Sequence, residues 1–363
     1  MPRTAFHIII FIILIFIHPE VKSQCQIDSI LRYKSSTCRN EPADTIIVNT
    51  YDATGQLSAQ VHSVRLDSLN QYIEFKKENL EYDAHQNKTR DLIWVKNPKG
   101  NEPWSMRYLA SFKYDENDNL IESAEKFIPA AGNGAYEKID LYKYNENNLK
   151  VEHTIRYWNK SLRSWIDSTQ TIYEYDADSN VTYALTLKKD LEENKWEPHK
   201  IVNNIYDKQK NITDTQSKIW GGAFRQWMPE ERITYIYNKN NKIKKTIYQD
   251  WYRPGHCWIN SIVISNSYDT QHNIIGSKIK RPAKNHYLYS PLSKITYRYN
   301  TQNQITEAFY LAWDKKEKAS KPYAYYKYKY SPSNKLTVEE KYWNYDAPNE
   351  GPQNYQKTIY RCR

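Results

Sequence analysis

The sequence contains 363 residues, with 52 basic and 42 acidic side chains, a formal net charge of +10 and a mean hydropathy of −0.89. Only 9 residues are Gly, which excludes collagen-like and Gly-rich disordered chains. The 33 Tyr and 11 Trp exclude a disordered polar chain, and the low hydropathy excludes a multi-pass membrane protein.

Residues 1–23 have the pattern of a secretory signal peptide. Arg3 precedes an apolar run, 8–17, that is too short to cross a bilayer, since a spanning helix needs about 20 residues. Ser23 fits the small-residue rule for cleavage, so Gln24 is expected to begin the mature chain. We therefore predict a secreted, extracellular or periplasmic protein without stable membrane insertion; an uncleaved membrane anchor is the alternative.

Residues 24–50 precede the first full repeat, and we predict that they form an N-terminal cap. Residues 26–33 suit a short helix, and 45–50 (Thr-Ile-Ile-Val-Asn-Thr) suit a strand.

The four Cys of the chain permit disulfides, because an even number of Cys is typical of exported proteins with such bonds. Cys25 and Cys38 are the closest pair and would staple the cap. Cys257 and Cys362 are then left as the second pair. The spacings match no metal-binding motif, so neither a metal nor another cofactor is predicted.

Residues 51–363 consist of ten repeats of about 31 residues. Each repeat begins at a Tyr that is followed by Asp, Asn or Ser, and successive Tyr lie 30 to 32 residues apart. This regularity identifies a tandem array, which we treat as a single repeat domain. The ten Tyr define position 0 of each repeat: Tyr51, Tyr82, Tyr114, Tyr144, Tyr175, Tyr206, Tyr237, Tyr268, Tyr299 and Tyr330.

A polar turn is predicted directly after each of these Tyr. Position 1 is Asp or Asn in nine repeats, and such side chains open turns by accepting backbone hydrogen bonds. Position 4 is Gly, Asn, Asp or His in seven repeats, the residue types that best tolerate a positive φ. Position 6 is aliphatic in eight repeats and is expected to start the next strand.

Each repeat is predicted to be a β-hairpin. Side chains before each Tyr alternate, as in 233–237 (Ile-Thr-Tyr-Ile-Tyr), which is typical of a strand. We expect a first strand over positions 5–14, a tip loop, and a second strand over positions 21–30. All 11 Trp lie at positions 12–14 or 21–22, so Trp from the two strands are expected to pair across the hairpin.

Ten hairpins in series predict an all-β chain in which neighbouring hairpins pair side by side, because a two-stranded unit is marginal alone. Strands twist by roughly 20–25° each, so we expect one long antiparallel sheet that coils into a spiral or solenoid with the Tyr inward. A five-bladed propeller, with two hairpins in each blade, is the alternative.

Residues 51–57 (Tyr-Asp-Ala-Thr-Gly-Gln-Leu) resemble the YD repeat of RHS-type proteins, whose pattern is Tyr-x-Tyr-Asp-x-x-Gly-Arg-Leu. The segments 173–176, 142–145 and 297–300 carry its first half, the last two with Asn in place of Asp. The resemblance implies a spiralling β-shell of hairpins. It also extends to short secreted Tyr/Trp-repeat proteins of bacteria. The period here is longer, the Arg is absent, and neither a toxin domain nor an RHS core segment is recognised.

The sequence contains no nucleophile elbow, P-loop, dinucleotide fingerprint or zinc-protease helix, and its His show no ligand spacing. We therefore predict no catalytic residues and no enzyme, although a glycosidase-type carboxylate pair is not excluded by pattern. The sequence contains no dense basic run, so nucleic acid is not predicted as a partner.

The two Trp positions are the best candidate site. Equivalent Trp of adjacent hairpins are expected about 10 Å apart, two strand spacings, which suits stacking on a glycan. Our first prediction is a structural or adhesive surface scaffold with a cell-surface protein or polysaccharide as partner. The alternative is a glycan-binding module. Its candidate ligand-binding residues are Trp158, Trp165, Trp196, Trp220, Trp227, Trp251 and Trp258.

Overall fold

The computed structural model describes residues 27–33, 43–66, 70–100, 102–129, 136–282, 289–314, 316–343 and 354–362. These residues confirm the all-β prediction, because they form 22 strands and only two short 3₁₀ turns, η1 (Gly222–Phe224) and η2 (Arg253–Gly255). The predicted signal peptide lies outside the described residues. None of the described helices is long and apolar enough to cross a membrane.

The chain divides into two compact units, which we call the long unit (residues 45–294) and the terminal unit (residues 1–44 and 295–363). In the long unit, successive strands pair antiparallel from β2 through to β17. The strands up to β9 are β2 (Thr45–Tyr51), β3 (Leu57–Leu66), β4 (Gln71–Tyr82), β5 (Lys88–Val95), β6 (Ser105–Tyr114), β7 (Leu120–Phe127), β8 (Tyr136–Tyr144) and β9 (Lys150–Asn159). The remaining ones are β10 (Ser164–Tyr175), β11 (Val181–Asp190), β12 (Lys195–Tyr206), β13 (Ile212–Gly221), β14 (Gln226–Tyr237), β15 (Ile243–Tyr252), β16 (Cys257–Tyr268) and β17 (Ile274–Pro282); β18 (Tyr289–Tyr299) spans the unit boundary.

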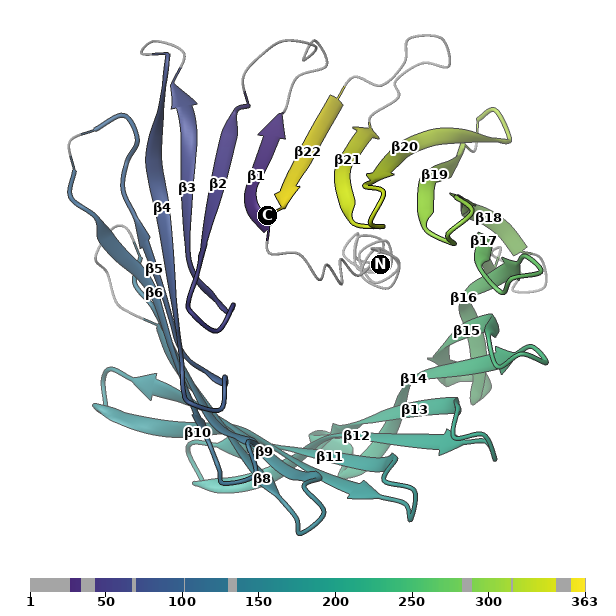
Figure 1. Ribbon diagram of the computed structural model, residues 1–363. Coiled ribbons are helices and arrows are strands. Elements are labelled where there is room, and N and C mark those ends of the chain that lie inside the picture. The colour runs from purple at the N-terminus through teal and green to yellow at the C-terminus, as the bar shows by residue number, and fades with distance from the viewer. Residues whose placement is uncertain are drawn as a thin grey trace. The chain divides into compact units, whose positions relative to one another are not determined.

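The terminal unit brings the two ends of the chain together. It contains β1 (Ile27–Tyr33), β19 (Ile305–Asp314), β20 (Ala319–Tyr330), β21 (Leu336–Trp343) and β22 (Asn354–Cys362). Figure 1 shows β22 between β21 and β1, and Ile30 of β1 lies opposite Tyr360 of β22. The helix expected over 26–33 is therefore wrong: this segment is extended because it pairs with the edge of the last hairpin.

The predicted open spiral or solenoid is wrong, and so is the five-bladed propeller. All 22 strands belong to one antiparallel sheet, and the pairing of β1 with β22 joins the first strand to the last. A spiral would leave its first and last strands unpaired with each other, and a propeller would separate into four-stranded blades. The repeat pattern specifies that neighbours pair, but it does not specify what covers the outer edges. Here the N-terminal strand covers one of them, which removes an exposed pairing edge.

Every hairpin has two distinct faces, because cross-strand partners point to the same side of a sheet and successive residues alternate. In β14, Trp227 lies opposite Trp220 on one face, whereas Tyr235 lies opposite Thr246 on the other. We call these the Trp face and the Tyr face. The seven candidate Trp all lie on the Trp face of β9–β16. The alternation along each strand places the position-0 Tyr on the opposite face, the Tyr face.

The position-0 Tyr join each repeat to the one before it. In β14, the Tyr237 hydroxyl donates a hydrogen bond to the carbonyl of Ile212, which lies at position 6 of the preceding repeat. Eight repeats have this bond, at 2.6–3.0 Å, so the register of the Tyr in the sequence reflects a contact that recurs with each hairpin. Burial raises the pKa of these hydroxyls, as at Tyr175 and Tyr237, so they remain protonated donors.

The predicted turns form in all ten repeats. In the second repeat, the Oδ1 atom of Asp83 accepts the backbone N–H groups of His85 and Asn87, each at 2.9 Å. All ten position-4 residues have a positive φ, including Gln86, Ser179 and Lys210, whose types disfavour it.

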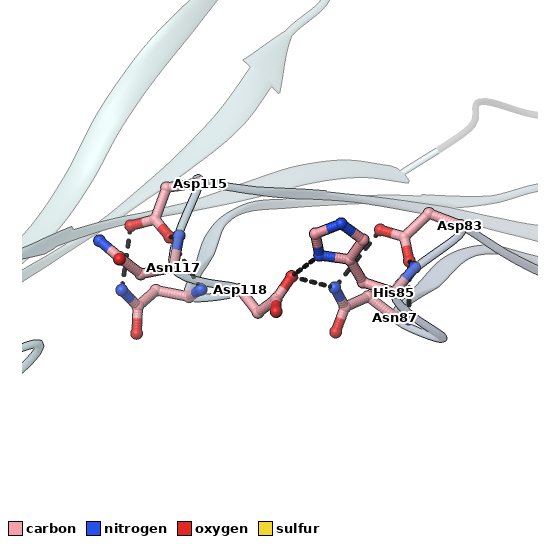
Figure 2. A network of polar contacts seen from close by, with 7 residues as sticks. Asp83, His85, Asn87, Asp115, Asn117 and Asp118 are labelled. Carbon is pink, nitrogen blue, oxygen red and sulfur yellow. Dashed lines mark hydrogen bonds and ion pairs between the residues drawn. The ribbon is translucent and has the colours of Figure 1, made fainter.

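Contacts between successive turns explain why position 4 is seldom Gly. Figure 2 shows the Asp118 carboxylate reaching back to the preceding turn, where it accepts a hydrogen bond from Asn87 at 2.7 Å and lies 2.9 Å from His85 Nδ1. Lys210 likewise forms an ion pair with Asp178 at 2.9 Å. A side chain at position 4 thus links two turns, which offsets the cost of its left-handed backbone.

Candidate binding surface on the tryptophan face

At the end of each hairpin that lies away from the turns, its two strands stay paired beyond the point where pairing with the neighbouring hairpin stops. The described pairing of β10 with β11 extends no further toward the tip than Thr169 opposite Lys188, whereas β9 and β10 continue together to Asn159 opposite Ser164. Four consecutive hairpins repeat this arrangement. We call their two-stranded ends fingers 1 to 4: residues 158–165, 189–196, 220–227 and 251–258.

A β-bulge at the base of each finger accompanies this separation. In β10 the register shifts between Asp167 and Thr169, which leaves Ser168 as the extra residue. The same repeat position, 24, carries the bulge in β12, β14 and β16. A bulge bends and twists its strand, so it directs the finger away from the next hairpin.

Trp pairs are the main side-chain contact on three of the fingers. The ring centroids of Trp158 and Trp165 lie 5.6 Å apart at an interplanar angle of 68°. The pairs of finger 3 and finger 4 have nearly the same edge-to-face geometry, at 5.2 and 5.1 Å. Such pairs contribute about 0.5–1.5 kcal/mol beyond the area that they bury. The predicted cross-strand pairing of Trp is therefore confirmed on fingers 1, 3 and 4.

Finger 2 replaces one Trp by a cation. Lys189 lies directly opposite Trp196, and its ammonium group is 5.3 Å from the centre of the indole ring. The same Lys donates a hydrogen bond to the Asn194 carbonyl at 2.8 Å. The sequence analysis missed Lys189, although it stands at position 14, where the neighbouring repeats have Trp.

The candidate Trp are neither buried nor fully exposed. Trp165 is 37% exposed, and the other six are half-buried. The Trp pairs therefore pin the two strands of a finger together, yet part of each indole stays in contact with solvent.

Polar side chains lie beside the Trp on the same face. Below the finger 1 pair, Arg156 forms an ion pair with Asp167 at 2.5 Å. At the corresponding place below finger 4, Gln249 donates a hydrogen bond to Asn260 at 3.0 Å. The four fingers thus share aromatic tips but differ in the charge next to them.

Four-residue loops close the fingers, and each ends in a left-handed residue. The φ angles of Arg163, Asn194, Arg225 and His256 lie between 46° and 52°. Asn70 and Lys318 have the same conformation at the same repeat position in other hairpins. None of these residues is Gly, and the sequence analysis did not identify position 19 as a turn position.

A shallow pocket of about 230 Å³ opens between fingers 1 and 2. Trp158 is the only candidate Trp in its lining, so the structure places the others outside it. The lining residues are Tyr157, Trp158, Asn159, Ile166, Asp167, Ser168, Lys188, Lys189 and Leu191.

The other candidate groups do not gather into a chemical site. The predicted disulfide partners Cys25 and Cys38 lie outside the described residues. Cys257 is an exposed free thiol, so it does not form the second predicted pair with Cys362. In the part of the chain that the structure describes, no group of three His, Cys, Asp or Glu side chains could hold a metal ion.

No family model matches the chain. A curated relative, the tRNA nuclease WapA of Bacillus subtilis (strain 168), is 25% identical over an alignment of 154 residues that covers 39% of this chain and 6% of the relative. The chain thus matches a small part of that protein, and the identity is too low to establish a family.

The solved structures that resemble the chain do so at low similarity. The TcdB2-TccC3 structure is 13% identical with a TM-score of 0.43, over 90% of this chain and 18% of that one. A porin-like protein from Bacteroides uniformis is 9% identical with a TM-score of 0.31, over 93% and 98% of the two chains. A DUF3836 family protein from Bacteroides vulgatus is 21% identical with a TM-score of 0.21, over 25% and 89%. TM-scores this low carry no argument about the fold or the function of this chain.

Proposed function

We propose that the protein is a secreted, non-enzymatic adhesive scaffold that binds an extended polysaccharide along fingers 1 to 4. The observation that carries this proposal is the repetition of half-buried Trp on one face of four consecutive hairpins, at position 21 in all four and at position 14 in three. The contact that repeats between hairpins is made by the position-0 Tyr. The Trp are therefore not needed to join one hairpin to the next.

A polysaccharide suits this surface for chemical reasons. The faces of a sugar ring carry C–H groups, and its rim carries hydroxyl groups. An indole offers a flat apolar face to the C–H groups. Arg156, Asp167 and Asn260 offer polar partners to the hydroxyl groups. A polymer can contact several fingers at once, so weak contacts at each finger would add up through multivalency.

A purely structural scaffold is the second candidate. The edge-to-face Trp pairs support it, since they stabilise the hairpin ends without any ligand. The exposure of Trp165 favours binding instead, because a ring that only pins two strands gains by being covered.

We also propose that the array is a variant of the YD/RHS type. The support is the Tyr-Asp register and the turn at 51–57, in which Asp52 accepts the N–H groups of Thr54 and Gln56 at 2.9 Å. The nuclease activity named for the relative does not transfer, because the matched segment is 6% of that protein.

The test is retention of the purified protein on insoluble polysaccharides, followed by binding of soluble oligomers measured by calorimetry. We expect Trp227→Ala and Trp258→Ala each to weaken binding about tenfold, and the double variant to abolish retention. The matched control is Trp313→Ala, which removes a position-14 Trp from a hairpin outside the four fingers. No retention on any polysaccharide, with a folded protein by circular dichroism, would leave the structural scaffold as the better account.

A further inference from the structure

The pocket between fingers 1 and 2 is a slit through the edge of the sheet. Beyond Thr169 opposite Lys188, β10 and β11 are not described as paired, so the two fingers separate there. Residues from both faces line the slit: Tyr157 and Ile166 belong to the Tyr face, whereas Trp158 and Asp167 belong to the Trp face. A ligand in the slit would therefore contact both faces of the sheet.

The size of the slit suits one ring. Pockets for drug-sized ligands occupy about 300–1,000 Å³, and the slit holds about 230 Å³. Trp158 supplies an aromatic wall, and Ile166 and Leu191 supply aliphatic ones. A single sugar ring of a longer chain is the kind of group that fits this space.

The charges of the slit favour an anion. Lys188 and Lys189 line it from finger 2, and the structure assigns Lys188 no ion pair with any described carboxylate. The lining contains one carboxylate, Asp167, and Arg156 already neutralises it at 2.5 Å.

Two of the three acidic side chains of finger 2 are also engaged elsewhere. Asp190 accepts the backbone N–H groups of Glu192 and Glu193 at 2.8 and 3.0 Å, and Glu193 forms an ion pair with Lys195. Lys188 thus has no carboxylate partner among the described residues, and Lys189 uses one of its three N–H donors on the Asn194 carbonyl, which leaves donors on both ammonium groups for an anion.

We propose that this slit is a subsite for an acidic sugar, with the ring against Trp158 and a carboxylate or sulfate group in the slit, where Lys188 reaches it from the Tyr face and Lys189 from the Trp face. This inference rests on the proposed polysaccharide binding, and it names the class of polysaccharide: one that carries anionic groups. The remaining fingers contact the neighbouring sugars of the same chain.

The experiment compares three oligosaccharides of equal length by calorimetry with the full chain: a polyuronate, a sulfated galactan and a neutral galactan. We expect the anionic oligomers to bind at least tenfold more tightly than the neutral one at low salt. The double variant Lys188→Gln/Lys189→Gln should remove that preference, so that the anionic oligomers bind no more tightly than the neutral one. Trp158→Ala should weaken binding of all three.

The matched control is Lys218→Gln/Lys245→Gln, which removes the same charge from the Trp face of β13 and β15, outside the slit lining. If this control lowers anion binding as much as the slit variant does, general electrostatics explains the preference and the subsite is refuted. Equal affinity for anionic and neutral oligomers would also refute the subsite while leaving the proposed function intact. No binding of any oligomer would refute both. Whichever of the two anionic oligomers binds more tightly identifies the anionic group, carboxylate or sulfate.

Discussion

At the turn end of each hairpin, neighbouring repeats are joined by hydrogen bonds, as from Tyr237 to the Ile212 carbonyl and from Asn87 to Asp118. At the finger end, the described pairing between neighbouring hairpins stops short of the tips. The same residue types recur at the turn end throughout the array. The finger end keeps its Trp but changes its charges. The turn end therefore stabilises the array, and the finger end is where it can recognise a partner.

The largest expected effect comes from removing a position-0 Tyr. Tyr237→Ala should lower the free energy of unfolding by about 3 kcal/mol, the low end for an aromatic residue, because the ring is half-buried. Tyr237→Phe should cost about 1–2 kcal/mol, since the Ile212 carbonyl loses its donor. Urea unfolding and the melting temperature measure both.

The matched change at the finger end is Trp227→Ala, which should cost less than Tyr237→Ala. An equal loss would show that the Trp stabilise the array as much as the Tyr do, and the contrast between the two ends would fail.

The second expected effect is the coupling within a Trp pair. A double-mutant cycle on Trp220 and Trp227 should give a coupling energy of about 0.5–1.5 kcal/mol, because the rings meet edge to face at 5.2 Å. The same cycle on Lys189 and Trp196 should give a smaller value of about 0.5–1 kcal/mol, as for an exposed cation–π pair. A coupling near zero in both fingers would mean that the tips are held by their loops alone.

Most of the hairpin could be predicted from the sequence, because short-range chemistry specifies it. The period of the Tyr, the Asp or Asn at position 1 and the alternation before each Tyr predict both strands and the turn. The three turns with Gln86, Ser179 and Lys210 could not be predicted from residue type. In two of them, those with Gln86 and Lys210, a contact with the preceding turn accompanies the positive φ.

The closure of the sheet and the slit could not be predicted, because both depend on long-range pairing. Residues 27–33 have no strong strand pattern of their own, and they are extended because β22 presents an unpaired edge. The slit depends on where pairing between hairpins stops, which the bulge at position 24 determines. The sequence does show one feature of the slit: Lys189 stands at position 14 of its repeat, where the neighbouring repeats have Trp.

The third expected effect concerns acid. Asp207 lies in a turn where the side chain of Asn211 and backbone N–H groups hold the pKa of its carboxyl below the ordinary value of 3.8. A lowered pKa in the folded state means that the stabilisation is present above pH 3.8 and is lost as the pH falls through the lowered value. Asp115 and Asp176 behave alike, so the turns should weaken in acid.

Asp207→Asn checks this directly, since Asn occupies the same position in three other repeats, as Asn145, Asn238 and Asn300. We expect the melting temperature at pH 7 to change little. Between about pH 4 and pH 2.5 the variant should lose less melting temperature than the parent protein, by roughly the contribution of one turn. An unchanged acid slope would place the acid sensitivity outside the turns.

The smallest expected effect separates the two kinds of left-handed residue. Arg225 closes finger 3 with a φ of 47° and forms no described ion pair there, so Arg225→Gly should stabilise the protein by about 0.5 kcal/mol, the relief of a strained backbone less the added freedom of the unfolded chain. Lys210 has a φ of 64° but also pairs with Asp178 of the preceding turn. Lys210→Gly should therefore change stability by close to zero, because the relief of strain and the lost contact oppose each other. Thermal unfolding of the two variants side by side measures the difference. A larger gain at residue 210 than at 225 would show that contacts between turns contribute nothing, which would remove the physical reason for the contrast between the two ends of the hairpin.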